Sequence, residues 1–267
     1  MSLRSRSELA TAKRIVVKVG SSSISGDNEN VINDLVESLA SAHIRGAQIV
    51  LVSSGAIATG MPLLGMTAKP EDLPTSQALA AVGQSRLISR YQNSLERFNI
   101  VAGQVLLTAD DLAAEESTEN ARGAMQRLLE LRVLPIVNEN DTVATQEIRF
   151  GDNDRLAALV AVLVSADALI LLSDVDALYD MPPAKPGAKR IQQVAFENDL
   201  SSIEVGGTST GVGTGGAVTK VSAAKLANQA GIPVLLTSTA NIAQALDGQD
   251  VGTWFEADAL AATSEQD

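Results

Sequence analysis

The chain has 267 residues, of which 45% are hydrophobic, 19% charged and 3% aromatic, a balance that indicates a globular protein with an aliphatic core. Its formal net charge of -12 argues against a surface that binds nucleic acid or an anionic membrane. The sequence has no cysteine, which excludes disulfides, zinc–thiolate sites and thiol nucleophiles and fits a reducing compartment. No apolar stretch reaches the roughly 18 residues of a membrane helix, so we expect a soluble, cytoplasmic protein with neither membrane nor nucleic acid as a partner.

Short β-branched runs alternate with longer helical patterns. In chain order, the sequence predicts strand 14–19, helix 31–45, strand 48–53, helix 78–98, strand 101–107, helix 119–131, strand 133–137, helix 155–164, strand 168–172, helix 217–230, strand 233–237 and strand 251–255. This alternation indicates a mostly parallel sheet with helices on both faces. Ligands of such sheets bind at the carboxyl ends of the strands, so the residues after each strand are the first candidates for a site.

Two segments interrupt the alternation. Residues 179–189 are rich in proline and glycine and predict a loop, whereas residues 204–216 contain six glycines. Residues 211–216 formally match G-x-G-x-x-G, but they follow a polar loop instead of a strand and lack the acidic residue about 20 positions on, which argues against a dinucleotide site. No Walker A pattern is present either. The remaining interpretation is a glycine-rich loop leading into a helix with Lys220 in its first turn, which suits phosphate.

Polar residues follow the first two predicted strands. Lys18 lies in an otherwise apolar strand, where an ammonium group is costly unless it has a partner. It either reaches solvent at the strand end or points at phosphate oxygens, with Gly20 allowing close backbone approach. After the second strand, Ser53, Ser54 and Gly55 form either a plain strand-to-helix turn or an anion cradle. Each motif alone leaves both interpretations open.

Two further polar clusters stand at residues 138–141 (NEND) and 151–154 (GDND). The second could cap the helix that follows it, but capping needs one residue and three are present. Carboxylates in these clusters could bind an ammonium group, and amide N–H groups could bind a carboxylate. Together they would hold a free amino acid.

Other polar and aromatic residues have less specific interpretations. Ser173 and Asp174, after the strand at 168–172, form either a turn or a contact with a nucleotide. His43, the sole histidine, is expected in a surface or core role, and Trp254 is expected to pack. No spacing of His, Asp or Glu resembles a dedicated metal site.

Taken together, six segments resemble the ordered motifs of glutamate 5-kinases, which belong to the amino-acid kinase family. They are residues 18–22 (KVGSS), 53–57 (SSGAI), 80–85 (AAVGQS), 138–141 (NEND), 151–154 (GDND) and 213–220 (GTGGAVTK). One such motif is weak evidence, whereas six in order across most of the chain are specific. The resemblance implies a three-layer αβα sandwich with a largely parallel sheet of about eight strands.

The resemblance also implies a domain organisation. A kinase domain would span residues 14–257, with the glutamate site in its N-terminal part and the ATP site in its C-terminal part. Residues 1–13 and 258–267 would be tails. Many bacterial members continue into an RNA-binding PUA domain, which we do not expect here: either this member lacks the domain, or the sequence was cut before it. That departure leaves assembly and the strength of proline control open.

The implied activity is transfer of a phosphoryl group from ATP, with Mg²⁺, to the side-chain carboxylate of L-glutamate. This would be the first step of proline biosynthesis, with feedback inhibition by proline and a dimeric or tetrameric homo-oligomer. A kinase of the same family acting on N-acetylglutamate, aspartate, carbamate or UMP is the nearest alternative, but Asp141 favours a free α-ammonium group. A non-catalytic amino-acid-sensing module is another alternative, against which Lys18, Lys220 and Asp154 argue.

By position, the resemblance assigns the site residues. The implied glutamate-binding residues are Lys18, Ser54, Asp141 and Asn153. The implied ATP-binding residues are Ser173, Asp174, Thr214, Gly215, Gly216, Ala217, Val218, Thr219 and Lys220. Lys18 and Lys220 would stabilise the phosphoryl group in transfer, Asp154 would hold both lysines, and no residue is implied as a direct metal ligand. Because the attacking carboxylate is already ionised, catalysis would rest on alignment and on cations.

Overall fold

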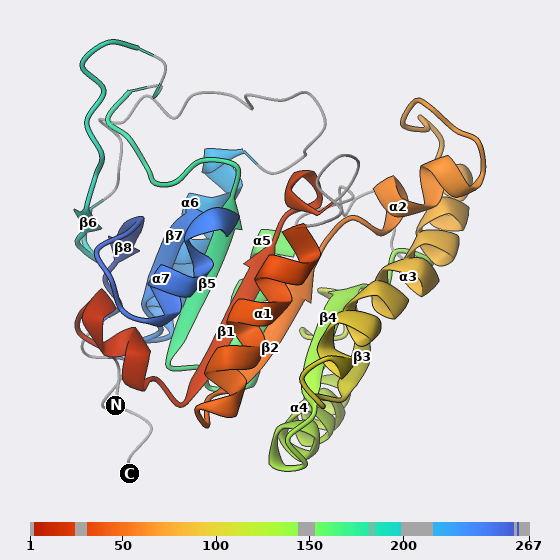
Figure 1. The fold of residues 1–267 in the computed structure, drawn as a ribbon, viewed down its shortest axis with the longest axis horizontal. Coiled ribbons are helices and arrows are strands. Elements are labelled where there is room, and N and C mark those ends of the chain that lie inside the picture. The colour runs from red at the N-terminus through yellow and green to blue at the C-terminus, as the bar shows by residue number, and fades with distance from the viewer. Residues whose placement is uncertain are drawn as a thin grey trace.

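The computed structural model describes residues 3–24, 31–143, 153–181, 183, 185–198, 216–258 and 261 (Figure 1). Within these residues, eight strands form one sheet in the order β3-β4-β2-β1-β5-β7-β8-β6. The strands are β1 (Arg14–Val19), β2 (Gln48–Ser53), β3 (Ala102–Leu107), β4 (Leu134–Glu139), β5 (Ala168–Ser173), β6 (Gln193–Val194), β7 (Val234–Ser238) and β8 (Thr253–Phe255). Neighbours from β3 to β7 pair in parallel, and β8 runs antiparallel to β7. The expected sheet is thereby confirmed.

Helices cover both faces of the sheet. They are α1 (Val31–Ile44), α2 (Ala56–Leu63), α3 (Leu73–Glu96), α4 (Glu115–Glu130), α5 (Asn153–Leu163), α6 (Ala217–Gln229) and α7 (Ile242–Leu246). Buried residues of α1, α3 and α7 share one core cluster, and those of α4, α5 and α6 share a second on the opposite face. In Figure 1, α1 and α7 lie in front of the sheet and α5 lies behind it. None of the helices in the described part of the chain is long and apolar enough to span a membrane.

The alternation of side chains along β1 determines where its lysine points. Ile15, Val17 and Val19 belong to the first core cluster, whereas Val16 belongs to the second. Because successive side chains of a strand point to opposite faces, Lys18 shares the face of Val16. The ammonium group is therefore directed toward the layer that contains α5 and α6.

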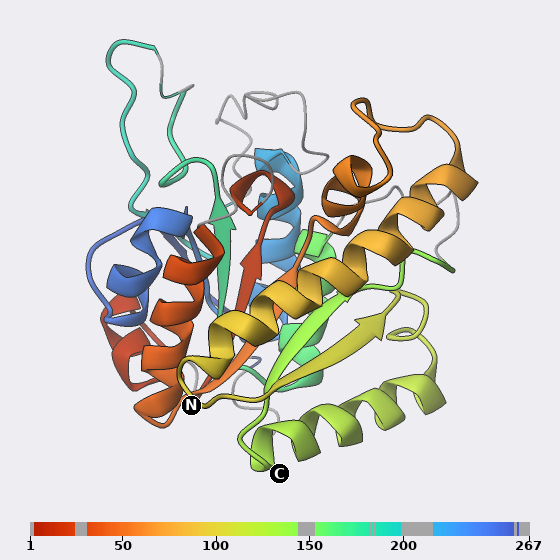
Figure 2. The same ribbon diagram turned by 45° about the vertical axis from the view of Figure 1, so that its right-hand side comes forward.

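Helices α2 and α3 cross at two glycines. A Cβ atom on Gly83 would stand 1.8 Å from the backbone oxygen of Ala56, and one on Gly60 would stand 2.1 Å from that of Leu79. Only glycine permits so close an approach of two helix backbones. Figure 2 shows α3 running across the face of the sheet, and the crossing holds its first half beside α2 at the carboxyl edge.

The predicted elements were found, with differences at their ends. Helix α3 begins at Leu73, five residues before the predicted start, because Asp72 caps it by accepting a hydrogen bond from the Thr75 backbone N–H at 2.8 Å. The short elements α2, α7 and β6 had not been predicted. The segment predicted as an N-terminal tail contains a 3-10 helix, Arg6–Thr11, and its Leu9 is buried in the first core cluster.

Four further predictions concern two loops and two single residues. The predicted loop at 179–189 holds, in its described part, one isolated bridge between Tyr179 and Arg190 and no helix or strand. The glycine-rich segment lies outside the described residues up to position 215. Trp254 packs in the first core cluster, as expected, and His43 is buried.

Candidate active site

The carboxyl ends of the parallel strands bring three charged residues together, although they are far apart in the sequence. Lys18 is near the end of β1, Asp154 is in the first turn of α5, and Lys220 is in the first turns of α6. Lys18 Nζ lies 2.6 Å from Asp154 Oδ1, and Lys220 Nζ lies 3.2 Å from Asp154 Oδ2. The carboxylate therefore bridges the two ammonium groups through separate oxygens.

This lysine–carboxylate–lysine centre is buried. The exposed fractions are 4% for Lys18, 1% for Asp154 and 7% for Lys220. Thr219 Oγ1 also donates a hydrogen bond to Asp154 Oδ2 at 2.8 Å. The two ammonium groups and the one carboxylate of this centre together carry a net positive charge, which attracts an anionic group. The centre is thus suited to bind an anionic group such as phosphate.

The electrostatics of Asp154 follow from this arrangement. Burial by itself would raise the pKa of Asp154. The nearby charges of Lys18 and Lys220, with hydrogen bonds from Lys18 and Thr219, outweigh burial and lower the pKa from 3.8 to about 2. The carboxylate therefore stays ionised at neutral pH and keeps both lysines in place.

Beside this centre, Asn153 connects the ends of two strands. Its Nδ2 donates to Ser54 Oγ at 2.9 Å, to the Ser53 backbone oxygen at 3.2 Å and to Asn138 Oδ1 at 3.2 Å. Asn138 Nδ2 in turn donates to Gln84 Oε1 at 2.6 Å. Asn153 and Asn138 are both buried, so these amides form a fixed polar wall between β2, β4 and α3.

Asp141 follows β4 two residues after the strand ends. Burial raises the pKa of Asp141 from 3.8 to about 6. A half-buried carboxylate with a raised pKa gains from a cationic partner, because that partner would stabilise its ionised form. This environment suits the ammonium-binding role predicted for Asp141, which stays a prediction.

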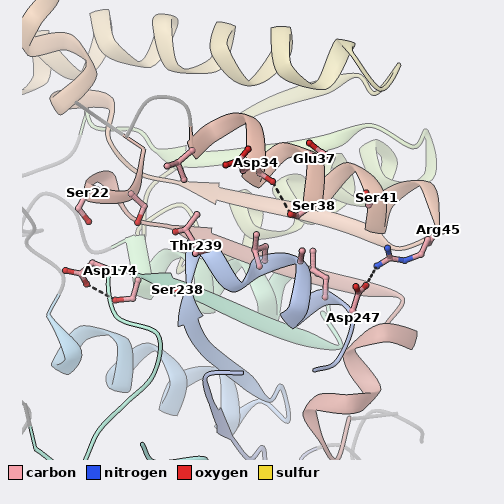
Figure 3. Close-up of a pocket in the computed structure, with 17 residues that line it drawn as sticks. Ser22, Asp34, Glu37, Ser38, Ser41, Arg45, Asp174, Ser238, Thr239 and Asp247 are labelled. Atoms are coloured by element: carbon pink, nitrogen blue, oxygen red, sulfur yellow. Dashed lines mark hydrogen bonds and ion pairs between the residues drawn. The ribbon is translucent and has the colours of Figure 1, made fainter. Parts of the chain in front are cut away.

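The residues predicted to bind ATP lie toward the other half of the sheet. Ser173 ends β5, and its hydroxyl donates to Asp174 Oδ1 at 3.0 Å. Both residues line a cavity of about 830 Å³ between α1 and α7 (Figure 3). The ion pair of Arg45 and Asp247, at 3.1 Å, stands at the far end of this cavity. An opening of this size beside the strand ends has room for part of a nucleotide.

The second predicted ATP segment is described only in part. Gly216 caps α6, and the side chain of Val218 is 62% exposed, whereas Thr219 and Lys220 face Asp154. Ala217 packs against the second core cluster. Thr214 and Gly215 lie outside the described residues.

Sequence reasoning missed some members of the polar wall. Asn138 was considered only as part of the 138–141 cluster expected to hold an amino acid, and Gln84, within the 80–85 motif, was assigned no role. Tyr91 was missed as well: it is fully buried on α3, and its hydroxyl lies 3.0 Å from Ser53 Oγ. The available signal for Tyr91 was a hydroxyl group on the buried face of a predicted helix. That signal does not reveal Ser53 as its hydrogen-bond partner.

A largely parallel αβα sandwich with two buried lysines around one carboxylate at its carboxyl edge defines the class of this protein: an α/β protein with a buried cationic centre for an anionic group. The model of the amino acid kinase family matches residues 13–238. The chain belongs to the amino acid kinase family.

Relatives and solved structures agree with this assignment. The glutamate 5-kinase of Clavibacter sepedonicus is 68% identical over 255 residues, which are 96% of this chain and 98% of that protein. The glutamate 5-kinase of Leifsonia xyli subsp. xyli is 62% identical over 256 residues, covering 96% of this chain and 95% of that protein. The structure of carbamate kinase from Giardia lamblia bound to AMP-PNP matches with a TM-score of 0.66 over 93% of this chain and 100% of that chain. Its sequence identity is 19%, so this last likeness concerns the fold.

Proposed function

We propose that this protein transfers the γ-phosphoryl group of ATP to the side-chain carboxylate of L-glutamate, giving L-glutamyl 5-phosphate and ADP. The observation that carries the proposal is the buried centre of Lys18, Asp154 and Lys220, in a chain 68% identical to a glutamate 5-kinase. The resemblance further supports a place at the first step of proline biosynthesis, inhibition by proline, a homo-oligomer and a cytoplasmic location.

The roles of the charged residues follow from the charges that meet in the reaction. A glutamate carboxylate approaches the γ-phosphoryl group, and an oxygen–phosphorus bond forms as the bond to ADP breaks. The nucleophile is already ionised, so no base is needed, and the obstacle is repulsion between anions. Lys18 and Lys220 supply two ammonium groups that stabilise the transferring group. Asp154 limits their mutual repulsion and fixes their direction, which removes the need to reorganise them during the reaction.

The glutamate side of the site is proposed to consist of Ser54, Asn153, Asp141 and Lys18. The carboxylate of Asp141 suits the positively charged α-ammonium group of glutamate. In N-acetylglutamate this group is a neutral amide. Ser54 and Asn153 are linked by a hydrogen bond of 2.9 Å, and Asn153 directly precedes Asp154 at the start of α5. The acceptor would therefore be held directly beside the cations.

The nucleotide side is proposed to consist of Ser173, Asp174 and the segment from residue 214 to Lys220. Mg²⁺ is expected to arrive with ATP. Among the described residues, no group of three or more His, Cys, Asp or Glu side chains could hold a metal ion. Magnesium needs no such group, because it keeps several waters and commonly binds substrate phosphates with one or two carboxylates. Asp174 is a carboxylate at this end of the site, and the ion would neutralise phosphate charge.

The proposal is tested by measuring ADP release from ATP and Mg²⁺ with L-glutamate, N-acetylglutamate, aspartate, carbamate or UMP as acceptor. Hydroxylamine would trap the acyl phosphate as a hydroxamate, which identifies the carboxylate as the acceptor. Of these five acceptors, we expect turnover only with L-glutamate, and we expect proline to inhibit it. Turnover with a different acid would refute the substrate, and binding of glutamate without any turnover would favour the sensing-module alternative.

A further inference from the structure

Gln84 lies on α3, within the segment 80–85, and the proposed reaction gives this segment no role. Its Oε1 accepts a hydrogen bond from Asn138 Nδ2 at 2.6 Å, across 54 positions of sequence. The neighbouring Gly83 is the glycine at which α3 approaches α2 most closely, since a Cβ there would stand 1.8 Å from the Ala56 oxygen. The close crossing brings the Gln84 side chain within reach of the end of β4.

The hydrogen bonds of Asn138 fix which way its amide faces. Asn138 Oδ1 accepts from the backbone N–H of Glu139 at 2.9 Å, and a backbone N–H can only donate. The same oxygen accepts from Asn153 Nδ2 at 3.2 Å. The Nδ2 group must then face the other way, where Gln84 supplies its acceptor. Gln84 thus holds the Nδ2 group of Asn138 on one side. The Oδ1 atom of Asn138 then faces Asn153 on the other side.

The same reasoning fixes the amide of Asn153. Its Nδ2 faces the Ser53 backbone oxygen at 3.2 Å, and that oxygen can only accept. The other atom, Asn153 Oδ1, is buried and has no hydrogen-bond partner among the described residues. A buried amide oxygen without a donor is unfavourable, so this atom favours a ligand that brings a donor. An ammonium group brings three donors.

We propose that Gln84 is a positioning residue for the α-ammonium group of the substrate, acting through Asn138 to hold Asn153 with its amide oxygen toward the ligand. The inference rests on the proposed function and deepens it. If the Asn153 amide turned over, it would present N–H groups to the ammonium and repel it. Asp141 supplies the negative charge for the ammonium group. The side-chain amides of Gln84, Asn138 and Asn153 together fix the direction in which the Asn153 amide oxygen points.

The test uses two substitutions of Gln84 in the full chain. Gln84→Leu removes the acceptor of Asn138 at similar volume, whereas Gln84→Glu keeps an acceptor oxygen. Ser85→Ala, at an exposed position on the same helix, is the matched control. Steady-state kinetics give kcat and the KM values for glutamate and ATP. Competition against glutamate gives the inhibition constant of glutarate, which is glutamate without its α-ammonium group.

We expect Gln84→Leu to raise the KM for glutamate about tenfold, as for a buried hydrogen bond left unsatisfied. The hydrogen bonds from Gln84 through Asn138 to Asn153 are proposed to affect binding of the α-ammonium group and not phosphoryl transfer. The values of kcat, the KM for ATP and the inhibition constant of glutarate should therefore stay within about twofold of those of the unmodified protein. Gln84→Glu should restore most of the glutamate affinity, and Ser85→Ala should behave as the unmodified protein.

Two outcomes would overturn the inference while leaving the proposed function standing. In one, Gln84→Leu keeps its KM for glutamate. In the other, the KM for glutamate and the inhibition constant of glutarate rise together, which would mean a general widening of the site. If Gln84→Leu melts at a much lower temperature than the unmodified protein, Gln84→Met repeats the test with an unbranched side chain. An unmodified protein that does not act on glutamate would refute the proposed function and this inference together.

Discussion

Replacing Asp154 with asparagine removes the negative charge that bridges two buried ammonium groups. A fall in the pKa of Asp154 from 3.8 to about 2 means that folding favours the ionised carboxylate over the neutral carboxyl group. At about 1.4 kcal/mol for each unit of pKa, this preference is about 2 kcal/mol. Asp154 is 1% exposed, so solvent does little to screen it. We expect Asp154→Asn to lower the free energy of unfolding by about this amount at pH 7.

The same shift predicts how the effect depends on pH. Because the folded pKa of Asp154 is depressed, its stabilising contribution is fully present above the unfolded pKa near 4. The contribution is lost as pH falls through the folded pKa of about 2. The unmodified protein and Asp154→Asn should therefore differ by about 2 kcal/mol from pH 7 to about pH 4 and converge toward pH 2.

Urea denaturation at a series of pH values measures both quantities, provided that the m-value is unchanged. Asp247→Asn is the control, since its ion pair with Arg45 is about half exposed and should contribute at most about 1 kcal/mol. A difference for Asp154→Asn that is as large at pH 2.5 as at pH 7 would refute the electrostatic account. So would a difference below about 0.5 kcal/mol at neutral pH, where the pKa shift predicts its full size.

Three further predictions concern catalysis, pH and packing. Lys220→Ala should lower kcat by about 10²–10³ with little change in the KM for glutamate, whereas Lys225→Ala, exposed on the same helix, should not; an unchanged kcat in steady-state assays would exclude the role of Lys220. Because the pKa of Asp141 is about 6, kcat/KM for glutamate should fall as pH drops from 7 to 5, and a pH profile of Asp141→Asn that keeps this fall would contradict the assignment. Gly83→Ala should destabilise the protein by several kcal/mol, because its Cβ would overlap a backbone oxygen of α2 at 1.8 Å. Gly123→Ala, with nothing within 4 Å of its Cβ, should stabilise α4 by up to about 1 kcal/mol, and equal melting temperatures for the two variants would disprove the packing account.

The sequence was sufficient for most of the fold because its strands are continuous apolar runs and its long helices are periodic. The short helix α2 escaped prediction, since it is eight residues long and contains Gly60 and Pro62, both poor helix formers. Its stability comes from packing against α3, which no local pattern reveals. The early start of α3 was signalled by Asp72 and Pro74 at its N-terminus, a cap signal that was overlooked.

The sequence allowed several residues of the candidate site to be proposed, but it revealed few of the contacts between them. Lys18 near the end of a predicted strand, Ser54 directly after one and the 151–154 cluster before a predicted helix were candidates from the sequence, because parallel strands gather their carboxyl ends at one edge. The bridging of Lys18 and Lys220 by one carboxylate came from the resemblance alone. The contact of Gln84 with Asn138 could not be predicted, because it depends on how closely two helices cross.

Two neighbouring residues at the start of α5 serve opposite halves of the site. Asn153 belongs to the polar wall proposed to receive the amino acid, and Asp154 belongs to the buried lysine pair. A change in the sequence of this first turn would therefore disturb acceptor recognition and phosphoryl transfer together. Evolution or engineering toward a different acceptor has a less constrained route at Asp141, which lies outside this turn and can change while the cations keep their places.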